Sequence, residues 1–106
     1  IITYVNRDES QADSVVAEYK RMTIFDKVTT LKPISYFLAK IKDADKFKKA
    51  AGEIFDFEGM AVFVKAFTLE AANWLLEKKQ ADLTANPTNT ALEDQIKYIK
   101  EKLISK

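Results

Sequence analysis

The sequence contains no histidine and no cysteine. Their absence excludes imidazole general bases, thiolate nucleophiles, disulfides and the usual zinc and haem ligands. The only glycines are Gly52 and Gly59, so no glycine-rich phosphate-binding motif can be assembled. We therefore predict a protein that is not an enzyme, with no catalytic residue, no cofactor and no metal site.

Turn-forming residues are also scarce, because 106 residues include only two glycines and two prolines. This composition favours long helices over many short strands. The chain has the length of one domain, residues 1–106, and its 47% hydrophobic and 31% charged residues are typical of soluble globular proteins. The longest apolar run, residues 60–64, is far shorter than the roughly 20 residues of a membrane-spanning helix.

Apolar residues recur at helical spacing along most of the chain. After a short extended segment over residues 1–5, the pattern predicts a helix over residues 8–22, with Asn6 and Glu9 as its capping box. A second helix follows Thr23 and bends or restarts at Pro33. After the proline, one apolar helical stripe is predicted from Ile34, Phe37, Leu38 and Ile41. The next begins at Asp43 or Asp45, another runs to about residue 80 with a new cap expected at Thr68, and the last begins at Thr90 after a loop over residues 84–89. The fold class is all-α, a compact bundle of four to six helices.

One stretch has two interpretations. Residues 54–64 read as a turn into a buried helix or as two strands around Glu58 and Gly59. The alanines that follow favour helix. The alternative is an α+β fold in which residues 1–5 and 60–67 are strands.

Paired carboxylates are the remaining acid–base groups. They occur as Asp43 with Asp45, Asp56 with Glu58, and Glu93 with Asp94, each at an expected helix start. Capping and compensation of the helix dipole are the commonest use of acidic residues at such positions. We therefore interpret these pairs as structural.

Two clusters are unusual enough to suggest an interaction surface. Five aromatic residues fall within twenty positions and do not all fit one helical stripe, which predicts an apolar partner-binding patch of Phe55, Phe57, Phe63, Phe67 and Trp74. Core packing is the default alternative for these rings. A basic rim is predicted from Lys40, Lys42, Lys46, Lys48 and Lys49. Solvated helix surface is the ordinary role of such lysines.

These features lead to three hypotheses of function. The first is a non-enzymatic accessory or structural subunit that docks on a larger protein complex, as extrinsic subunits of photosystem II and virion proteins do; any membrane association would be peripheral and through that complex. The second is a small lysine-rich nucleic-acid-binding or regulatory protein, although Arg7 and Arg21 are its only arginines. The third is a carrier of a hydrophobic ligand, with Tyr4, Tyr36 and Tyr98 as polar groups of its cavity.

The chain opens with Ile1 rather than Met. We expect it to be a processed mature chain or a cut fragment, and its localisation is therefore left open.

Overall fold

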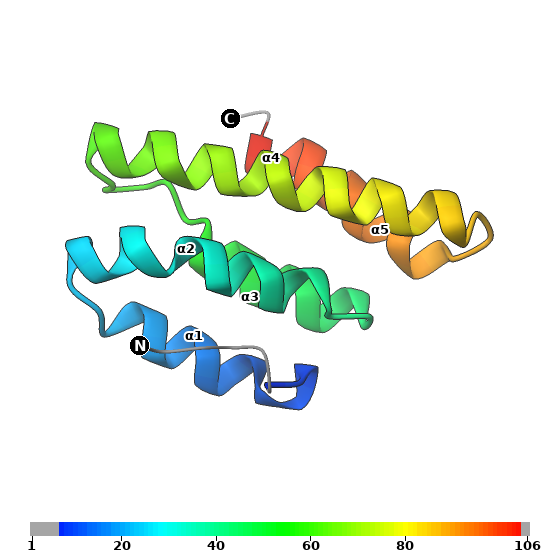
Figure 1. Ribbon diagram of the computed structural model, residues 1–106, viewed down its shortest axis with the longest axis horizontal. Helices are drawn as coiled ribbons and strands as arrows, with labels where there is room; N and C mark the ends of the chain where they lie inside the picture. Colours follow the sequence, from blue (N-terminus) through cyan, green and yellow to red (C-terminus); the bar gives the residue numbers. More distant parts are fainter. Residues whose placement is uncertain (1–6, 105–106) are drawn as a thin grey trace.

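Five α-helices account for most of the computed structural model, which describes residues 7–104 (Figure 1). Within this range there is no strand, which confirms the all-α bundle. The strand alternative for residues 60–67 is wrong because α4 covers residues 62–67, while residues 1–5 and Asn6 lie outside the described residues. The elements in chain order are the 3₁₀ turn Glu9–Gln11, α1 (Ala12–Lys20), α2 (Ile24–Ala39), α3 (Ala44–Ile54), α4 (Val62–Ala85), α5 (Thr90–Tyr98) and a closing π-helix, Ile99–Ile104.

Polar side chains begin four of these elements, because each can accept a hydrogen bond from an otherwise unpaired backbone N–H group. Thr23 accepts from the Asp26 N–H and Asp43 from the Lys46 N–H, as the sequence predicts. At the first turn, Asp8 forms a capping box with Gln11. At α5 the cap is Asn89, which accepts from the Leu92 N–H. The prediction of Thr90 as this cap is wrong by one residue.

Pro33 lies inside α2, where the sequence predicts a bend or a restart. The proline has no N–H to donate to the carbonyl of Thr29 four residues earlier. The helix continues nevertheless, because Leu31, Ile34 and Leu38 on both sides of the proline are buried in one core. Tertiary packing thus overrides the local preference of proline.

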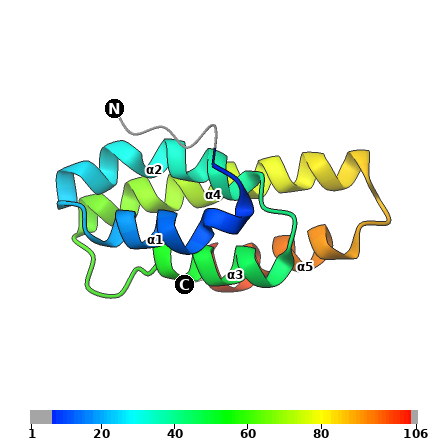
Figure 2. The same cartoon turned by 90° about the horizontal axis from the view of Figure 1, so that it is seen from below.

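The helices form two layers, with α2 and α4 on one side and α3 and α5 on the other (Figure 2). α1 packs chiefly against α3. α2 and α4 make the most extensive contact in the bundle although α3 separates them in sequence. Both run in the same direction, so their N-terminal ends lie at the same end of the molecule (Figure 1).

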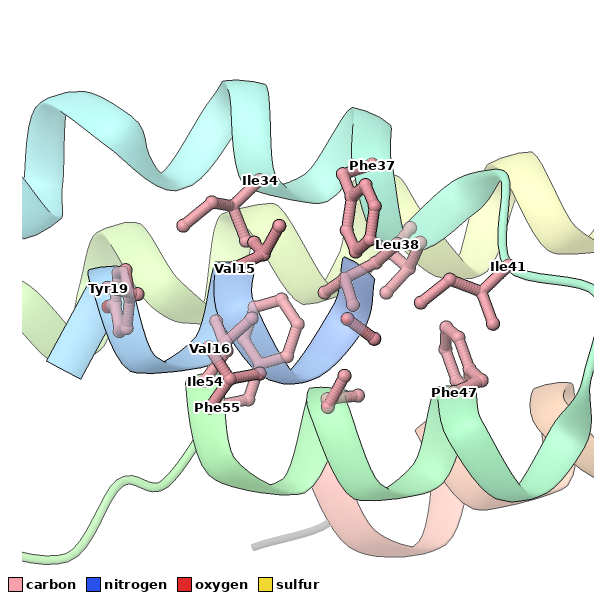
Figure 3. Close-up of a cluster of buried hydrophobic side chains, with 14 of the residues drawn as sticks. Val15, Val16, Tyr19, Ile34, Phe37, Leu38, Ile41, Phe47, Ile54 and Phe55 are labelled. Atoms are coloured by element: carbon pink, nitrogen blue, oxygen red, sulfur yellow. The ribbon is translucent and has the colours of Figure 1, made fainter. Parts of the chain in front are cut away.

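Side chains from α1, α2 and α3 meet in the centre of the core (Figure 3). The predicted apolar stripe of α2 lies there, and Ile34, Phe37, Leu38 and the following Ile41 are fully buried. Phe47 and Ile54 of α3 face them. The cluster comprises Ala12, Val15, Val16, Tyr19, Leu31, Ile34, Phe37, Leu38, Ile41, Phe47, Ala50, Ala51, Ile54, Phe55, Ala72, Leu75, Ile99 and Leu103.

α4 is one uninterrupted helix from Val62 to Ala85. The prediction of a new cap at Thr68 is wrong, since its hydroxyl donates to the carbonyl of Val64 within the helix. The loop that follows is shorter than the predicted 84–89, because residues 84 and 85 belong to α4. Before α4, a loop over residues 55–61 turns at Gly59, whose φ of 78° is a conformation that favours glycine.

Residues 40–43, which we call the connector, join α2 to α3 and are held from three other elements. The ammonium of Lys79 on α4 donates to the carbonyls of Ala39 (3.2 Å) and Ile41 (2.7 Å). Gln95 on α5 donates to the carbonyl of Lys42, and Glu9 accepts from the Asp43 N–H. Long-range hydrogen bonds therefore fix the place where the chain turns between the two layers.

Lys79 is an unusual member of this arrangement because only 1% of its surface is exposed. Its ammonium also lies 4.8 Å from the centroid of the Phe47 ring, a cation–π arrangement. Burial lowers the pKa of Lys79 to about 8, against the smaller raising effects of Asp82 and Glu9. The carbonyls at the C-terminal end of α2 are favourable partners for its positive charge.

Candidate functional site

The outer face of the α2–α4 layer contains a groove of about 380 Å³. We call it the α2–α4 groove. Its floor is made by buried Leu31 and Ser35 of α2 and by partly buried Ala71 of α4. The remaining lining residues rise around this floor and are Val28, Lys32, Tyr36, Phe67, Glu70 and Trp74.

Helical periodicity explains why these side chains share one face. On α2, residues 25, 28, 32 and 36 follow one another at steps of three or four, and on α4 residues 63, 67, 70 and 74 do the same. Because α2 and α4 run in parallel, Tyr36 and Trp74 meet edge to face with centroids 4.7 Å apart. The same register places Phe25 at the level of Phe63.

The aromatic rings on this face are exposed to an unusual degree. The exposed fractions are 75% for Phe25, 57% for Phe63, 49% for Phe67 and 45% for Tyr36. Isolated exposed apolar residues are common on monomers, whereas a contiguous set marks an interaction surface. This set lies on one face of two neighbouring helices, and the concave floor lies between them.

The two sides of the groove carry opposite charge. Lys32 lies on the α2 side and Glu70 on the α4 side, both exposed, and no ion pair joins either to another described residue. At the far end the ammonium of Lys78 lies 5.4 Å from the centroid of the Trp74 ring. The groove is therefore a depression lined by aromatic and polar side chains, with a lysine on its α2 side and a glutamate on its α4 side.

The structure separates the members of the predicted apolar patch. Phe63 and Phe67 are exposed, and Trp74 lies partly buried at one end of the groove. Phe55 is only 1% exposed and belongs to the core, while Phe57 packs against that core. Phe55 therefore cannot contribute to a docking surface, because the loop after α3 turns its ring inward.

The predicted basic rim does not border the groove. Lys40 and Lys42 belong to the connector after the C-terminal end of α2, and Lys46 lies in the first turn of α3. Phe25 lies in the first turn of α2, at the opposite end of that helix. Two lysines of α3 have acidic partners from other helices: Lys48 lies 2.7 Å from Asp94, and Lys49 lies 3.3 Å from Asp13. The Asp94 carboxylate raises the pKa of Lys48 by accepting its hydrogen bond.

One member of each predicted carboxylate pair has a structural partner. Asp43 caps α3, Asp56 accepts from the Glu58 N–H at 3.1 Å, and Asp94 forms the ion pair with Lys48. Within residues 7–104, no group of three acidic side chains is close enough to hold a metal ion. None of the helices in that range has the length and apolarity needed to cross a bilayer.

Sequence reasoning missed Phe25, Lys32 and Glu70 as parts of the site, and it assigned Tyr36 only to a ligand cavity. The spacing of Phe25, Val28, Lys32 and Tyr36 is visible in the sequence. However, the sequence does not show that α2 lies beside α4, and each half-groove alone resembles an ordinary helix surface.

The comparisons with protein-family models, curated proteins and solved structures found no match to this chain.

Proposed function

We propose that the protein is a non-enzymatic helical subunit that docks on a larger protein complex through the α2–α4 groove. The observation that supports this proposal is the set of exposed rings of Phe25, Phe63, Phe67 and Tyr36 on one face. Burying such rings against a partner removes a large apolar area from water. Aromatic residues are also the commonest energetic centres of protein interfaces.

Nucleic-acid binding has less support from the structure. The acidic partners Asp13 and Asp94 offset the charge of Lys49 and Lys48, and binding to phosphates requires uncompensated positive charge. A hydrophobic small-molecule carrier has less support as well, because the rings line an open groove whose flanks are charged.

The proposal is tested by placing a photoreactive phenylalanine analogue at position 67 and, as a matched control, at position 69. Leu69 is also exposed and apolar on α4, but it lies off the groove face. After irradiation in extract of the native source, we expect a discrete protein adduct from position 67, none from position 69, and no loss at high salt. Adducts from both positions alike, or salt-labile recovery of nucleic acid, would contradict the proposal.

A further inference from the structure

We propose that the occupant of the α2–α4 groove is an amphipathic helix of the partner, with acidic residues along one flank and basic residues along the other. This inference rests on the proposed docking function and names the partner's chemistry. The shape of the groove, its length and the charges on its two sides support such an occupant.

The shape is that of a trough between two parallel helices. The floor residues Ser35 and Ala71 are small, whereas Tyr36 and Phe67 rise beside them. Small residues below and large rings above form holes into which the side chains of a third helix can insert. An amphipathic helix in an apolar groove is a recurrent mode of peptide recognition.

The length also suits a short helix. From residue 25 to residue 36 the exposed stripe of α2 covers 12 positions, about 18 Å at 1.5 Å per residue. A helix with apolar residues at positions i, i+4, i+7 and i+11 presents an apolar stripe of the same length. One such helix would cover Phe63, Phe67 and Trp74 together.

The charges beside the groove indicate which charged residues the partner helix carries on either side of its apolar stripe. Lys32 on one side favours an acidic residue and Glu70 on the other favours a basic one, and both charges are exposed without an ion pair to a described residue. A helix with both flanks acidic or both flanks basic would meet one attractive and one repulsive side. Complementary flank charges select between partners more than they add affinity.

The test uses three synthetic helical peptides that share the same apolar stripe and differ only in their flanks: mixed, wholly acidic and wholly basic. Trp74 is the single tryptophan of the chain and lines the groove, so its fluorescence reports binding. We expect the mixed peptide to bind about two- to fivefold more tightly than either uniform peptide. Phe67→Ser is expected to weaken its binding by roughly tenfold or more. Leu69→Ser is the matched control and should leave the affinity unchanged.

Charge inversion supplies the decisive variant. With Lys32→Glu, both flanks of the groove become acidic, and the wholly basic peptide should then bind best. Circular dichroism verifies that each variant is folded. An unchanged ranking of the three peptides, or a Trp74 signal insensitive to Phe67→Ser, would overturn the inference. Self-association that fills the groove in sedimentation equilibrium, abolished by Phe67→Ser, would also overturn it by identifying a second copy as the occupant.

Failure of this inference is distinguishable from failure of the proposed function. If position 67 forms a protein adduct but no helical peptide binds, docking stands and the helical occupant is wrong. If position 67 forms no adduct, docking itself is wrong.

Discussion

At the scale of single residues, the buried ammonium of Lys79 couples the stability of the bundle to pH. Burial lowers its pKa from an ordinary 10.5 to about 8 in the folded protein. Between these two pH values the unfolded chain therefore holds more protons than the folded chain, and the free energy of unfolding rises with pH. The pKa difference of Lys79 between the unfolded and folded chain corresponds to a gain of roughly 3 kcal/mol in the free energy of unfolding across this window.

The prediction is that Lys79→Met removes this rise. Urea denaturation of the wild type and the variant, followed by circular dichroism across the window from pH 8 to 10.5, measures it. Lys78→Met is the matched control, because Lys78 is exposed one position away and lies over Trp74. If the free energy of unfolding of the Lys79→Met variant rose with pH as steeply as that of the wild type, Lys79 would not be the source of the rise.

At higher pH, Tyr19 makes the free energy of unfolding fall as pH rises, which is opposite to the effect of Lys79. Its hydroxyl is buried without a hydrogen-bond partner among the described residues, and burial raises its pKa to about 12. Above an ordinary value of 10 the unfolded chain loses a proton that the folded chain retains, so stability falls as pH rises toward 12.

Tyr19→Phe should raise the free energy of unfolding by about 1 kcal/mol at neutral pH, because it removes a buried hydroxyl that has no partner. The substitution should also remove the fall in stability that Tyr19 causes at alkaline pH. The same denaturation experiment extended above pH 10 measures both effects. A destabilised variant would show that the hydroxyl has a partner, such as water.

At the scale of elements, the two neighbouring residues at the start of α5 have different roles. Asn89 accepts the hydrogen bond from the Leu92 N–H, whereas Thr90 is already the first helical residue. Asn89→Ala should therefore lower the free energy of unfolding by about 1 kcal/mol, and Thr90→Ala should change it much less. Chemical denaturation of the pair measures the difference, and the reverse order would move the cap to Thr90.

Pro33 gives a second prediction for an element. Because Pro33 lies in the interior of α2, replacing it by alanine restores an N–H donor for the carbonyl of Thr29. Pro33→Ala should raise the free energy of unfolding by about 1–2 kcal/mol, after allowance for the larger entropy of the unfolded variant. Thermal melts measure the change. A lower melting temperature would mean that the ring itself contributes essential packing.

Prediction from sequence succeeded where one local pattern determines an element. The stripe Ile34, Phe37, Leu38 and Ile41 is buried as predicted. A period of 3.6 residues places all four side chains on one helix face, and that face packs against the core. Local rules failed at Pro33 and Thr68, where contacts from other helices decide the conformation. No local sequence rule predicts the burial of Lys79, since lysine is almost never fully buried unless paired.

At the scale of the whole molecule, phenylalanine occupies two different environments. Phe47 is fully buried, and Phe63 is 57% exposed. Phe47→Ala should therefore lower the free energy of unfolding by roughly 3–5 kcal/mol, and Phe63→Ala by less than about 1 kcal/mol. Urea denaturation of the two variants compares them. Equal losses would place Phe63 in the core and remove it from the exposed face beside the groove.

The arrangement of helices also limits what sequence could predict of the site. Phe63 and Phe67 were predicted as part of an apolar patch, but so was Phe55, which is in the core. α4 has apolar residues around most of its circumference, so periodicity alone does not identify its exposed side. The groove is produced by the parallel pairing of α2 with α4, and that pairing is a property of the whole fold.

The same pairing has a consequence for synthesis of the chain on the ribosome. The main neighbour of α2 is α4, and 22 residues separate the end of α2 from the start of α4. Folding during translation begins from the N-terminal side, so the first three helices emerge while the surface of α2 that α4 will cover is still bare. We therefore expect nascent chains that end before Val62 to be substrates for chaperones, and release from them to require translation of α4.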